Sequence, residues 1–258
     1  MKPPAKAYVW EEAGEEWSVP WGGSAPQWHG SILPRIADWL PAGVMLEIAP
    51  GFGRWTHYLQ AHCEQLVLVD LSATCIEACQ QRFAEKSNFS FHVNDGKSLA
   101  MVDDDSVDFV FSFDSLVHAP RPAIEAYLKQ LGRKLKPDGV GFFHHSNLAE
   151  SAGVARRILP ARATRRLVKW RVAESVHSRV PDMSAEIFRD LCAQSGLVCI
   201  RQETVNWRGR RLLDCLSTFV RAGSKWESPL SFWRNPEFMR EAELIRQRAQ
   251  TYPAARAT

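Results

Sequence analysis

The fold is decided by one stretch of the sequence, Val44-Met45-Leu46-Glu47-Ile48-Ala49-Pro50-Gly51-Phe52-Gly53-Arg54-Trp55. It begins with an apolar run of strand length that ends near a carboxylate, Glu47, and it continues through a loop with two glycines. Residues 56–59 then have helical character. A strand, a glycine loop and a helix in this order bring the backbone close to a nucleotide-like ligand. The stretch therefore predicts an α/β sheet with a ligand site at this loop.

The overall composition is that of a globular protein. The 258 residues are 45% hydrophobic and 24% charged, which suits one large domain or one domain with an insertion. No apolar run approaches the roughly 18 residues of a membrane span, and the first residues contain no apolar signal-peptide core. The six cysteines form no CxxC pair and fall within helix or strand patterns. We therefore expect a cytoplasmic protein with free thiols. No tight metal-ligand spacing is present, so no metal site is assigned, although Asp114, His144 and His145 could contribute ligands to a divalent metal and metal dependence stays open.

Strand and helix patterns alternate along the chain up to residue 145. The strand patterns cover 44–48, 66–70, 89–93, 107–113 and 140–145, and helical patterns cover 54–62, 72–83 and 122–135. This alternation predicts a parallel sheet with right-handed crossovers. A helix over 184–195 and two strands, 197–207 and 212–220, follow. The connection between these two strands is too short for a crossover, so we expect an antiparallel hairpin.

Polar side chains stand where the predicted parallel strands end. They are Glu47, Asp70, Asp95, Asp114 and the pair His144 and His145. Because the carboxyl ends of parallel strands meet at one edge of the sheet, these side chains should gather around one crevice.

The spacing of the glycines excludes a dinucleotide site. The fingerprint G-x-G-x-x-G would need glycines at 51, 53 and 56, but residue 56 is Thr. A frame that starts at residue 49 meets Ala49 and Arg54 instead of glycines.

The pattern that is present reads acid-x-small-x-Gly-x-Gly, formed by Glu47, Ala49, Gly51 and Gly53. It resembles the first motif of class I S-adenosylmethionine-dependent methyltransferases, with Ala49 in place of the usual first glycine. The later features follow in the family's order: Asp70 after the second strand, Asn94-Asp95-Gly96 after the third, Asp114 after the fourth, and the turn Leu135-Lys136-Pro137-Asp138-Gly139 before the fifth. The resemblance covers residues 40–145, and residues 184–221 by the order of elements only.

This resemblance implies the fold, the cofactor and the cofactor site. The fold is a Rossmann-like α/β sheet of seven strands, mostly parallel with an antiparallel C-terminal hairpin, with helices on both faces. The cofactor is S-adenosylmethionine, with Asp70 at the ribose hydroxyls, Asp95 at the adenine amino group and Asp114 at the methionine part. The implied cofactor-binding residues are Glu47, Ala49, Gly51, Gly53, Asp70, Leu71, Asp95, Gly96 and Asp114.

The chemistry of the cofactor agrees with these residues independently. S-adenosylmethionine has no pyrophosphate, so its site does not need the third glycine. Its sulfonium and ammonium groups are cationic, which favours acids at the strand ends. Glycines at 51 and 53 let the backbone approach a ligand closely because they carry no Cβ.

Three histidines are candidates for the general base of a methyl transfer. An alcohol acceptor holds its proton tightly, and histidine titrates nearest to neutral pH. His118 follows the fourth strand, where the family often has a histidine. His144 and His145 end the fifth strand and point to opposite faces, so we expect only one of them to reach the crevice. The choice among the three stays open, and each also has a purely structural interpretation.

The acceptor is indicated by a basic segment after the fifth strand. Residues 151–180 contain eight Lys or Arg, between 156 and 179, against one acid. They suit a phosphorylated acceptor or an anionic membrane surface, or they form a solvated helix without a partner. His144-His145-Ser146-Asn147 and the hairpin over 207–218 resemble bacterial sugar and polysaccharide O-methyltransferases. We therefore predict O-methylation of a small polar acceptor, such as a sugar hydroxyl in a glycan or glycoside pathway.

Two other functions stay open. One is an RNA methyltransferase guided by the basic segment, and the other is a non-catalytic S-adenosylmethionine-binding interaction protein. Nucleic acid is disfavoured by the loop after the fourth strand, which reads Asp114-Ser115-Leu116-Val117 and lacks the [DNS]-P-P-[FYW] motif of enzymes that methylate base amino groups. No cysteine that could attack a base lies near this loop. The oligomeric state is not indicated by the sequence.

These features divide the chain into five parts. Residues 1–40 form a Trp-rich N-terminal arm with a helix, which should pack on the main domain and either pin it or cover the ligand site. The cofactor-binding core over 41–147 is followed by the basic helical insertion over 148–183 and the rest of the core over 184–222. The tail over 223–258 has turns at Ser228-Pro229 and Asn235-Pro236 and then a helix over 237–250.

Overall fold

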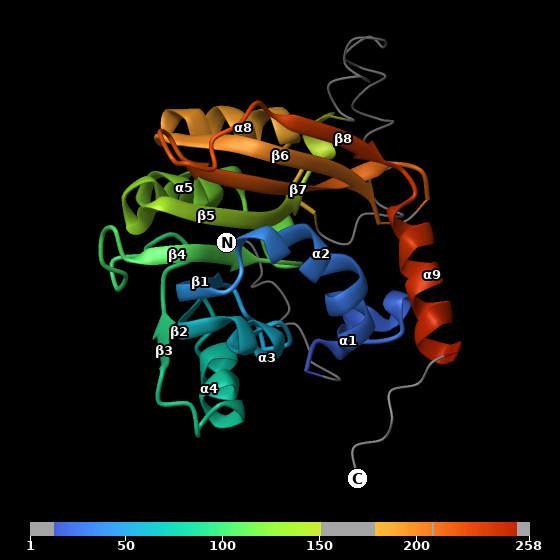
Figure 1. The fold of residues 1–258 in the computed structure, drawn as a ribbon, viewed down its shortest axis with the longest axis horizontal. Coiled ribbons are helices and arrows are strands. Elements are labelled where there is room, and N and C mark those ends of the chain that lie inside the picture. Colours follow the sequence, from blue (N-terminus) through green and yellow to red (C-terminus); the bar gives the residue numbers. More distant parts are fainter. Residues whose placement is uncertain (1–12, 151–178, 208, 252–258) are drawn as a thin grey trace, which may run out of the picture.

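The computed structural model describes residues 13–150, 179–207 and 209–251, which form an eight-stranded sheet covered by helices (Figure 1). The strands are β1 (Ala42–Ile48), β2 (Cys63–Asp70), β3 (Phe89–Val93), β4 (Val107–Ser112), β5 (Leu135–Ser146), β6 (Leu197–Asn206), β7 (Leu212–Arg221) and β8 (Ser231–Asn235). Their order across the sheet is β3-β2-β1-β4-β5-β7-β6-β8. β1 to β5 pair in parallel, and β7 runs antiparallel to both β5 and β6. The predicted α/β sheet with its closing antiparallel hairpin is confirmed.

The edge strand β8 is not predicted by the sequence pattern. It pairs in parallel with β6, and four of its five residues are exposed. A strand that is exposed to solvent on both faces lacks the apolar run or the apolar–polar alternation from which a strand is predicted. The predicted tail therefore contains turns and a helix but misses this element.

Helices lie on both faces of the sheet. They are α1 (Ser24–Gln27), α2 (Leu33–Ile36), α3 (Thr56–Leu59), α4 (Ala73–Arg82), α5 (Arg121–Lys134), α8 (Ala185–Gln194) and α9 (Phe238–Thr251). Ser72 and Ser184 accept hydrogen bonds from the backbone at the starts of α4 and α8, so both predicted N-caps are confirmed. The predicted helix over 54–62 is shorter than expected: α3 is followed by a 3-10 turn over Gln60–His62.

Two hydrophobic cores lie on opposite faces of the sheet. On one face, Trp21, Trp28 and Ile36 from the N-terminal segment pack against Phe111 and Phe142 of β4 and β5. On the other face, residues of α5 and α8 pack against the same two strands, with members that include Leu128, Leu131, Phe188, Val110 and Phe143. The sheet is therefore the shared layer between two sets of helices.

The described part of the N-terminal segment, residues 13–40, packs on the main domain. It forms short helical turns, which include the 3-10 helix η1 (Glu15–Trp21), and these turns lie beside α9 (Figure 1). The Arg35 guanidinium of α2 donates to Glu203 of β6 and to Glu241 of α9, with N–O distances of 2.8 to 3.0 Å. This guanidinium therefore ties the N-terminal segment to both the sheet and the tail helix.

The basic insertion lies almost entirely outside the described residues. Only 148–150 and 179–183 of the predicted 148–183 are described, and Arg179 is the one member of the basic set among them. None of the described helices is long and apolar enough to cross a membrane.

The link made by Arg35 can be tested by substitution. We expect Arg35→Gln to lower the free energy of unfolding by about 3 kcal/mol, because it leaves two partly buried carboxylates without their partner. Urea unfolding measures this change. Arg240→Gln is the matched control, since Arg240 is exposed and sits on α9 beside Glu237, so its effect should stay within about 0.5 kcal/mol. Equal effects of the two variants would contradict the link.

Candidate active site

The glycine loop after β1 has the backbone conformation that its residue types suggest. Gly51 and Gly53 have φ of 58° and 80°, in the left-handed region that glycine occupies without strain. A Cβ on Gly53 would lie 2.6 Å from Phe83 Cε2, so this position also requires glycine for space. The Gly53 carbonyl accepts from the His57 amide, which starts the helix that follows. The two glycines thus give the loop its shape, and Phe83 packs closely against it.

Ala49 stands in the left-handed region too, with φ of 58°. For a residue with a Cβ this conformation costs roughly 1–2 kcal/mol. Its amide donates to Val69 O at 2.7 Å, and its carbonyl accepts from Ser115 Oγ at 2.9 Å. These bonds hold Ala49 in the left-handed conformation between β2 and the loop after β4. Glycine adopts this conformation without strain, which explains why the family pattern has glycine here.

We expect Ala49→Gly to raise the free energy of unfolding by about 0.5 kcal/mol. The substitution removes the left-handed strain, and the extra freedom of glycine in the unfolded chain, worth roughly 0.4–1 kcal/mol, offsets part of the gain. Urea unfolding measures the change. Ala78→Gly is the control, because Ala78 lies inside α4 in ordinary helical conformation and should lose about 1 kcal/mol. A loss at Ala49 as large as that at Ala78 would contradict the strain.

Glu47 lies beneath the loop. Its side chain is buried, and its Oε2 accepts from Thr56 Oγ1 at 2.5 Å. Burial raises the pKa of the Glu47 carboxyl to about 8, against the opposing effect of the Thr56 hydrogen bond. This acid therefore joins β1 to the start of α3, and its carboxyl is protonated at neutral pH in the free protein.

The raised pKa predicts how stability depends on pH. Glu47 ionises near its ordinary pKa of 4.5 in the unfolded chain and near 8 in the folded protein, so its contribution to stability is full below 4.5 and is lost as pH rises toward 8. Glu47→Gln lacks this loss. We expect the free energy of unfolding of Glu47→Gln, relative to wild type, to rise by about 3 kcal/mol between pH 5 and pH 7.5.

Urea unfolding at several pH values measures this difference. Glu64→Gln is the control, because Glu64 is exposed on β2 and its difference from wild type should stay flat. A flat difference for Glu47→Gln would show that Glu47 ionises normally in the fold.

The predicted ribose and adenine residues gather at the ends of β2 and β3. Asp70 accepts from the Gly51 amide at 3.2 Å and from the Ser72 amide at 2.8 Å, so this acid is joined to the glycine loop. Asp95 is exposed, and its Oδ1 accepts from the amides of the next turn. Leu71 is 64% exposed, and a Cβ on Gly96 would lie 3.6 Å from its Cδ1. An acid and an apolar surface therefore stand side by side at this edge.

Asp114 is the most constrained residue at the end of β4. It has a left-handed φ of 68°. Its Oδ2 lies 2.5 Å from Arg54 Nη2, and the same guanidinium donates to Ser18 Oγ of the N-terminal segment at 2.9 Å. Burial opposes ionisation, but the Arg54 charge and the His144 ring outweigh it and hold the pKa of Asp114 below its ordinary value. The carboxylate is therefore charged and paired.

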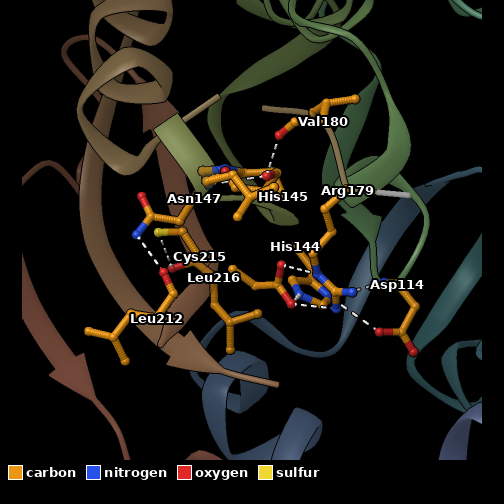
Figure 2. A network of polar contacts seen from close by, with 12 residues as sticks. Asp114, His144, His145, Asn147, Arg179, Val180, Leu212, Cys215 and Leu216 are labelled. Atoms are coloured by element: carbon orange, nitrogen blue, oxygen red, sulfur yellow. Dashed lines mark hydrogen bonds and ion pairs between the residues drawn. The ribbon is translucent and has the colours of Figure 1, made fainter. Parts of the chain in front are cut away.

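His144, at the end of β5, is buried between two carboxylates (Figure 2). Its Nδ1 lies 3.2 Å from the Asp114 amide nitrogen and 3.3 Å from Asp114 Oδ1. Its Nε2 approaches Asp214 Oδ2 at 3.4 Å without the alignment of a hydrogen bond. Burial lowers the pKa of His144, but the two carboxylates raise it by more, so the pKa lies above its ordinary value. The ring thus holds its proton more tightly than an exposed histidine.

The far carboxylate, Asp214 of β7, is held by Arg179. The guanidinium donates to both carboxylate oxygens, at 2.5 and 2.7 Å, and both side chains are buried. The next residue, Val180, accepts from Ser146 Oγ and donates to the Val117 carbonyl in the loop after β4. These contacts join five charged or titratable side chains into one connected set, which we name the charge network: Arg54, Asp114, His144, Asp214 and Arg179.

Asp214 and Arg179 are members that sequence reasoning missed. Asp214 is an acid inside the apolar strand Leu212–Arg221, which is the signal that could have found it. Arg179 reads as one cation among the eight of the basic segment, but its charge is committed to Asp214. No pattern in the sequence singles it out.

The other two histidines are not part of the charge network. His145 points to the opposite face, where its ring stacks on Phe188 at 4.1 Å and its Nε2 lies 2.8 Å from Ser217 Oγ. Burial lowers the pKa of His145 to about 4. His145 of β5 therefore packs against α8 on the face away from the charge network, which corrects its place among the candidate bases. His118 is exposed in the 3-10 turn Leu116–His118 that follows β4.

A metal centre is not formed by the described side chains. They contain no group of three or more His, Cys, Asp or Glu residues arranged to hold an ion.

Comparison with known proteins agrees with this geometry. Residues 45–139 match the methyltransferase domain family, and this interval contains the glycine loop, Asp70, Asp95 and Asp114. These residues are a methyltransferase domain, and together with the fold they support a class I S-adenosylmethionine-dependent methyltransferase. No curated protein matches this methyltransferase.

Solved structures share the fold of this methyltransferase. A protein from Pyrococcus horikoshii OT3 is 21% identical, with 76% of this chain and 88% of that chain covered and a TM-score of 0.54. A protein assigned as a sarcosine dimethylglycine methyltransferase from Galdieria sulphuraria is 14% identical, with 78% and 86% covered and a TM-score of 0.56. The N-methyltransferase NodS from Bradyrhizobium japonicum WM9 is 15% identical, with 75% and 94% covered and a TM-score of 0.52. At these identities the likeness establishes the fold and leaves the acceptor open.

The residues of this methyltransferase fit S-adenosylmethionine. Exposed Leu71 beside Gly96 offers an apolar surface to an adenine ring, and the nearby acids Asp70 and Asp95 can accept from hydroxyl and amino groups. The left-handed glycines bring backbone to the same edge without a Cβ. These residues would hold the cofactor, which supplies a methyl group on a cationic sulfonium.

Proposed function

We propose that this methyltransferase transfers the methyl group to a hydroxyl oxygen of a small, uncharged polar acceptor, such as a sugar hydroxyl in a glycan or glycoside pathway. The observation that carries the proposal is the charge balance of the charge network. Its two carboxylates, Asp114 and Asp214, are each paired with an arginine.

This balance favours a neutral acceptor. With a neutral His144 ring the network sums to zero, and with a protonated ring it sums to +1. An amine at neutral pH arrives as an ammonium ion, which would need a carboxylate that is not already paired. A hydroxyl carries no charge and asks only for a hydrogen-bond partner and a base.

His118 is the histidine best suited to remove the hydroxyl proton. His144 is buried between two carboxylates that raise its pKa, and its Nδ1 already accepts from the Asp114 amide, so it is poorly placed to take a proton from a hydroxyl. His118 is exposed four residues after Asp114, at the carboxyl end of β4. The turn that carries it is anchored where the Val117 carbonyl accepts from the Val180 amide at 3.1 Å. In this assignment His118 takes the proton, and His144 positions Asp114 by accepting from its backbone amide.

We expect His118→Asn to lower kcat by about 100-fold or more while the Kd for S-adenosylhomocysteine stays within about twofold, because a positioned base contributes roughly 10²–10⁴-fold. Calorimetry gives the Kd, and transfer of labelled methyl gives kcat. His57→Asn is the matched control, since His57 is an exposed histidine of α3. Unchanged kcat in His118→Asn would remove His118 as the base.

The acceptor class is tested by transfer of labelled methyl to a panel of neutral glycosides, nucleotide sugars, small amines and RNA. The proposal expects a methyl ether on a sugar, stable to mild base. The nucleotide sugars test the phosphorylated acceptor that the basic segment predicts, and anionic vesicles test its predicted membrane contact. Methylation of amines only, or of RNA with a steep dependence on salt, would overturn the proposal.

A further inference from the structure

Strand β8 (Ser231–Asn235) forms one edge of the sheet, and its outer side is unpaired among the described residues (Figure 1). On its inner side it pairs in parallel with β6, from Arg201 opposite Ser231 to Val205 opposite Asn235. Within residues 13–150, 179–207 and 209–251, no backbone hydrogen bond reaches the outer side of β8. The N–H and C=O groups of an unpaired strand edge are a template for pairing with a strand of another chain.

The exposed aromatic side chains of the described residues gather at this edge. Trp233 is 57% exposed, Phe232 is 44% exposed, and Trp226, shortly before the strand, is 38% exposed. The other large apolar side chains that are exposed in the same part of the chain are aliphatic. Aromatic side chains are enriched at interfaces between proteins relative to the rest of the surface. The edge at β8 therefore combines unpaired backbone with the side chains of an interface.

The opposite edge of the sheet, β3, differs in this respect. Its aromatic residues Phe89 and Phe91 are partly buried and pack against the core on one face of the sheet. Only its last residue, Val93, is exposed, at the end of the strand where the predicted cofactor residues gather. Of the two edges, β8 is therefore the one that offers aromatic surface to another chain.

The sequence around β8 limits how a second strand pairs with it. Pro229 and Pro236 stand on either side of the strand, and proline has no N–H group to continue a ladder. Antiparallel pairing of β8 with the β8 of a second copy engages all five residues in a single register, in which Trp233 faces the partner's Trp233. A two-fold axis at Trp233 relates the two strands in this arrangement.

The side chains of β8 complement one another in this register. Phe232 faces the partner's Arg234, and a guanidinium over an aromatic face is attractive. The side chain of Arg234 is 57% exposed although it pairs with Glu150 of its own chain, so its guanidinium is open to a second contact. The two-fold axis repeats this pair and joins the two Trp233 indoles as a cross-strand aromatic pair.

The charge of the strand favours the antiparallel arrangement over a parallel one. Arg234 is the one charged residue of β8, and in the antiparallel register it does not face its own copy. A parallel pairing in register places the two Arg234 side chains directly opposite each other. Like charges in that position destabilise a strand pair, so β8 complements itself only in the antiparallel arrangement.

We propose that two copies of this methyltransferase associate through their β8 strands, antiparallel and centred on Trp233, so that one sheet runs through both chains. This inference goes beyond the proposed function and does not depend on the acceptor. A two-fold interface uses the same surface on both copies, so association through β8 ends at a dimer. Five paired residues on each side make a small interface, so we expect the dimer to dissociate on dilution in the micromolar range.

Two substitutions of Phe232 test the register. Phe232→Lys places a cation opposite the partner's Arg234, and Phe232→Glu places an anion there, while both remove the same exposed ring. Sedimentation velocity over a dilution series gives the dimer Kd of the full chain. We expect Phe232→Lys to raise this Kd by about tenfold or more, and Phe232→Glu to keep it within about threefold of the wild-type value. Val19→Lys is the control, because Val19 is an apolar residue of η1 with 61% exposure and should leave the Kd unchanged.

Far-UV circular dichroism and calorimetry with S-adenosylhomocysteine verify that each variant is folded. A wild-type chain that stays monomeric at the highest concentration, or that assembles beyond a dimer, would overturn the proposal. Equal changes of the Kd in the two Phe232 variants would also overturn it, because they would indicate contact without the pairing of Phe232 and Arg234. A dimer that neither variant affects forms through another surface and overturns it as well. None of these measurements uses an acceptor, so failure of the dimer and failure of O-methylation are distinguishable.

Discussion

The structure depends on the pairing of buried charges in the charge network. Burying an unpaired charge costs several kcal/mol of folding free energy, and only a well-placed partner of opposite charge offsets this cost. Here the partners come from five places in the chain: the glycine loop, the loop after β4, the end of β5, the start of β7 and the last residues of the basic insertion. Each charged group is therefore satisfied only when all five segments are in place. The network makes the formation of the site a condition of the fold around it.

Much of the fold follows from local sequence. The parallel strands are read from their apolar runs, because both of their faces are buried, and the starts of α4 and α8 are read from Ser72 and Ser184. β8 is not predicted from the sequence, because its pairing with β6 is set by tertiary contacts and most of its side chains are exposed to solvent. Composition alone predicts that the Trp-rich arm packs on the protein. Its short helical turns are not predicted, because they are too short to produce a periodic pattern of apolar residues.

The candidate site likewise contains residues that local sequence predicts and residues that only the tertiary structure brings together. Acids at the ends of parallel strands are predictable, because topology brings those ends to one edge. Asp214 is not predictable in this way, since it lies near the start of β7. Because β7 runs antiparallel to β5, its first residues meet the last residues of β5, and Ser146 pairs with Asp214. The same reversal brings Trp207, in the turn just before β7, against His144. A sequence pattern gives the strands but not the register that joins them.

Backbone strain is found at the edge of the sheet where the candidate site lies. Ala49 and Asp114 are non-glycine residues in the left-handed region, and they stand just beyond the ends of two adjacent strands, β1 and β4. Ser115 Oγ donates to the Ala49 carbonyl, so the loop after β4 is joined to strained Ala49 through the residue that follows strained Asp114. Such conformations persist only where the surroundings over-determine them. At Asp114 the surroundings are Arg54 and His144, and at Ala49 they are β2 and Ser115. The backbone at the cofactor edge is therefore held in its shape before any ligand arrives, and binding does not have to meet that cost.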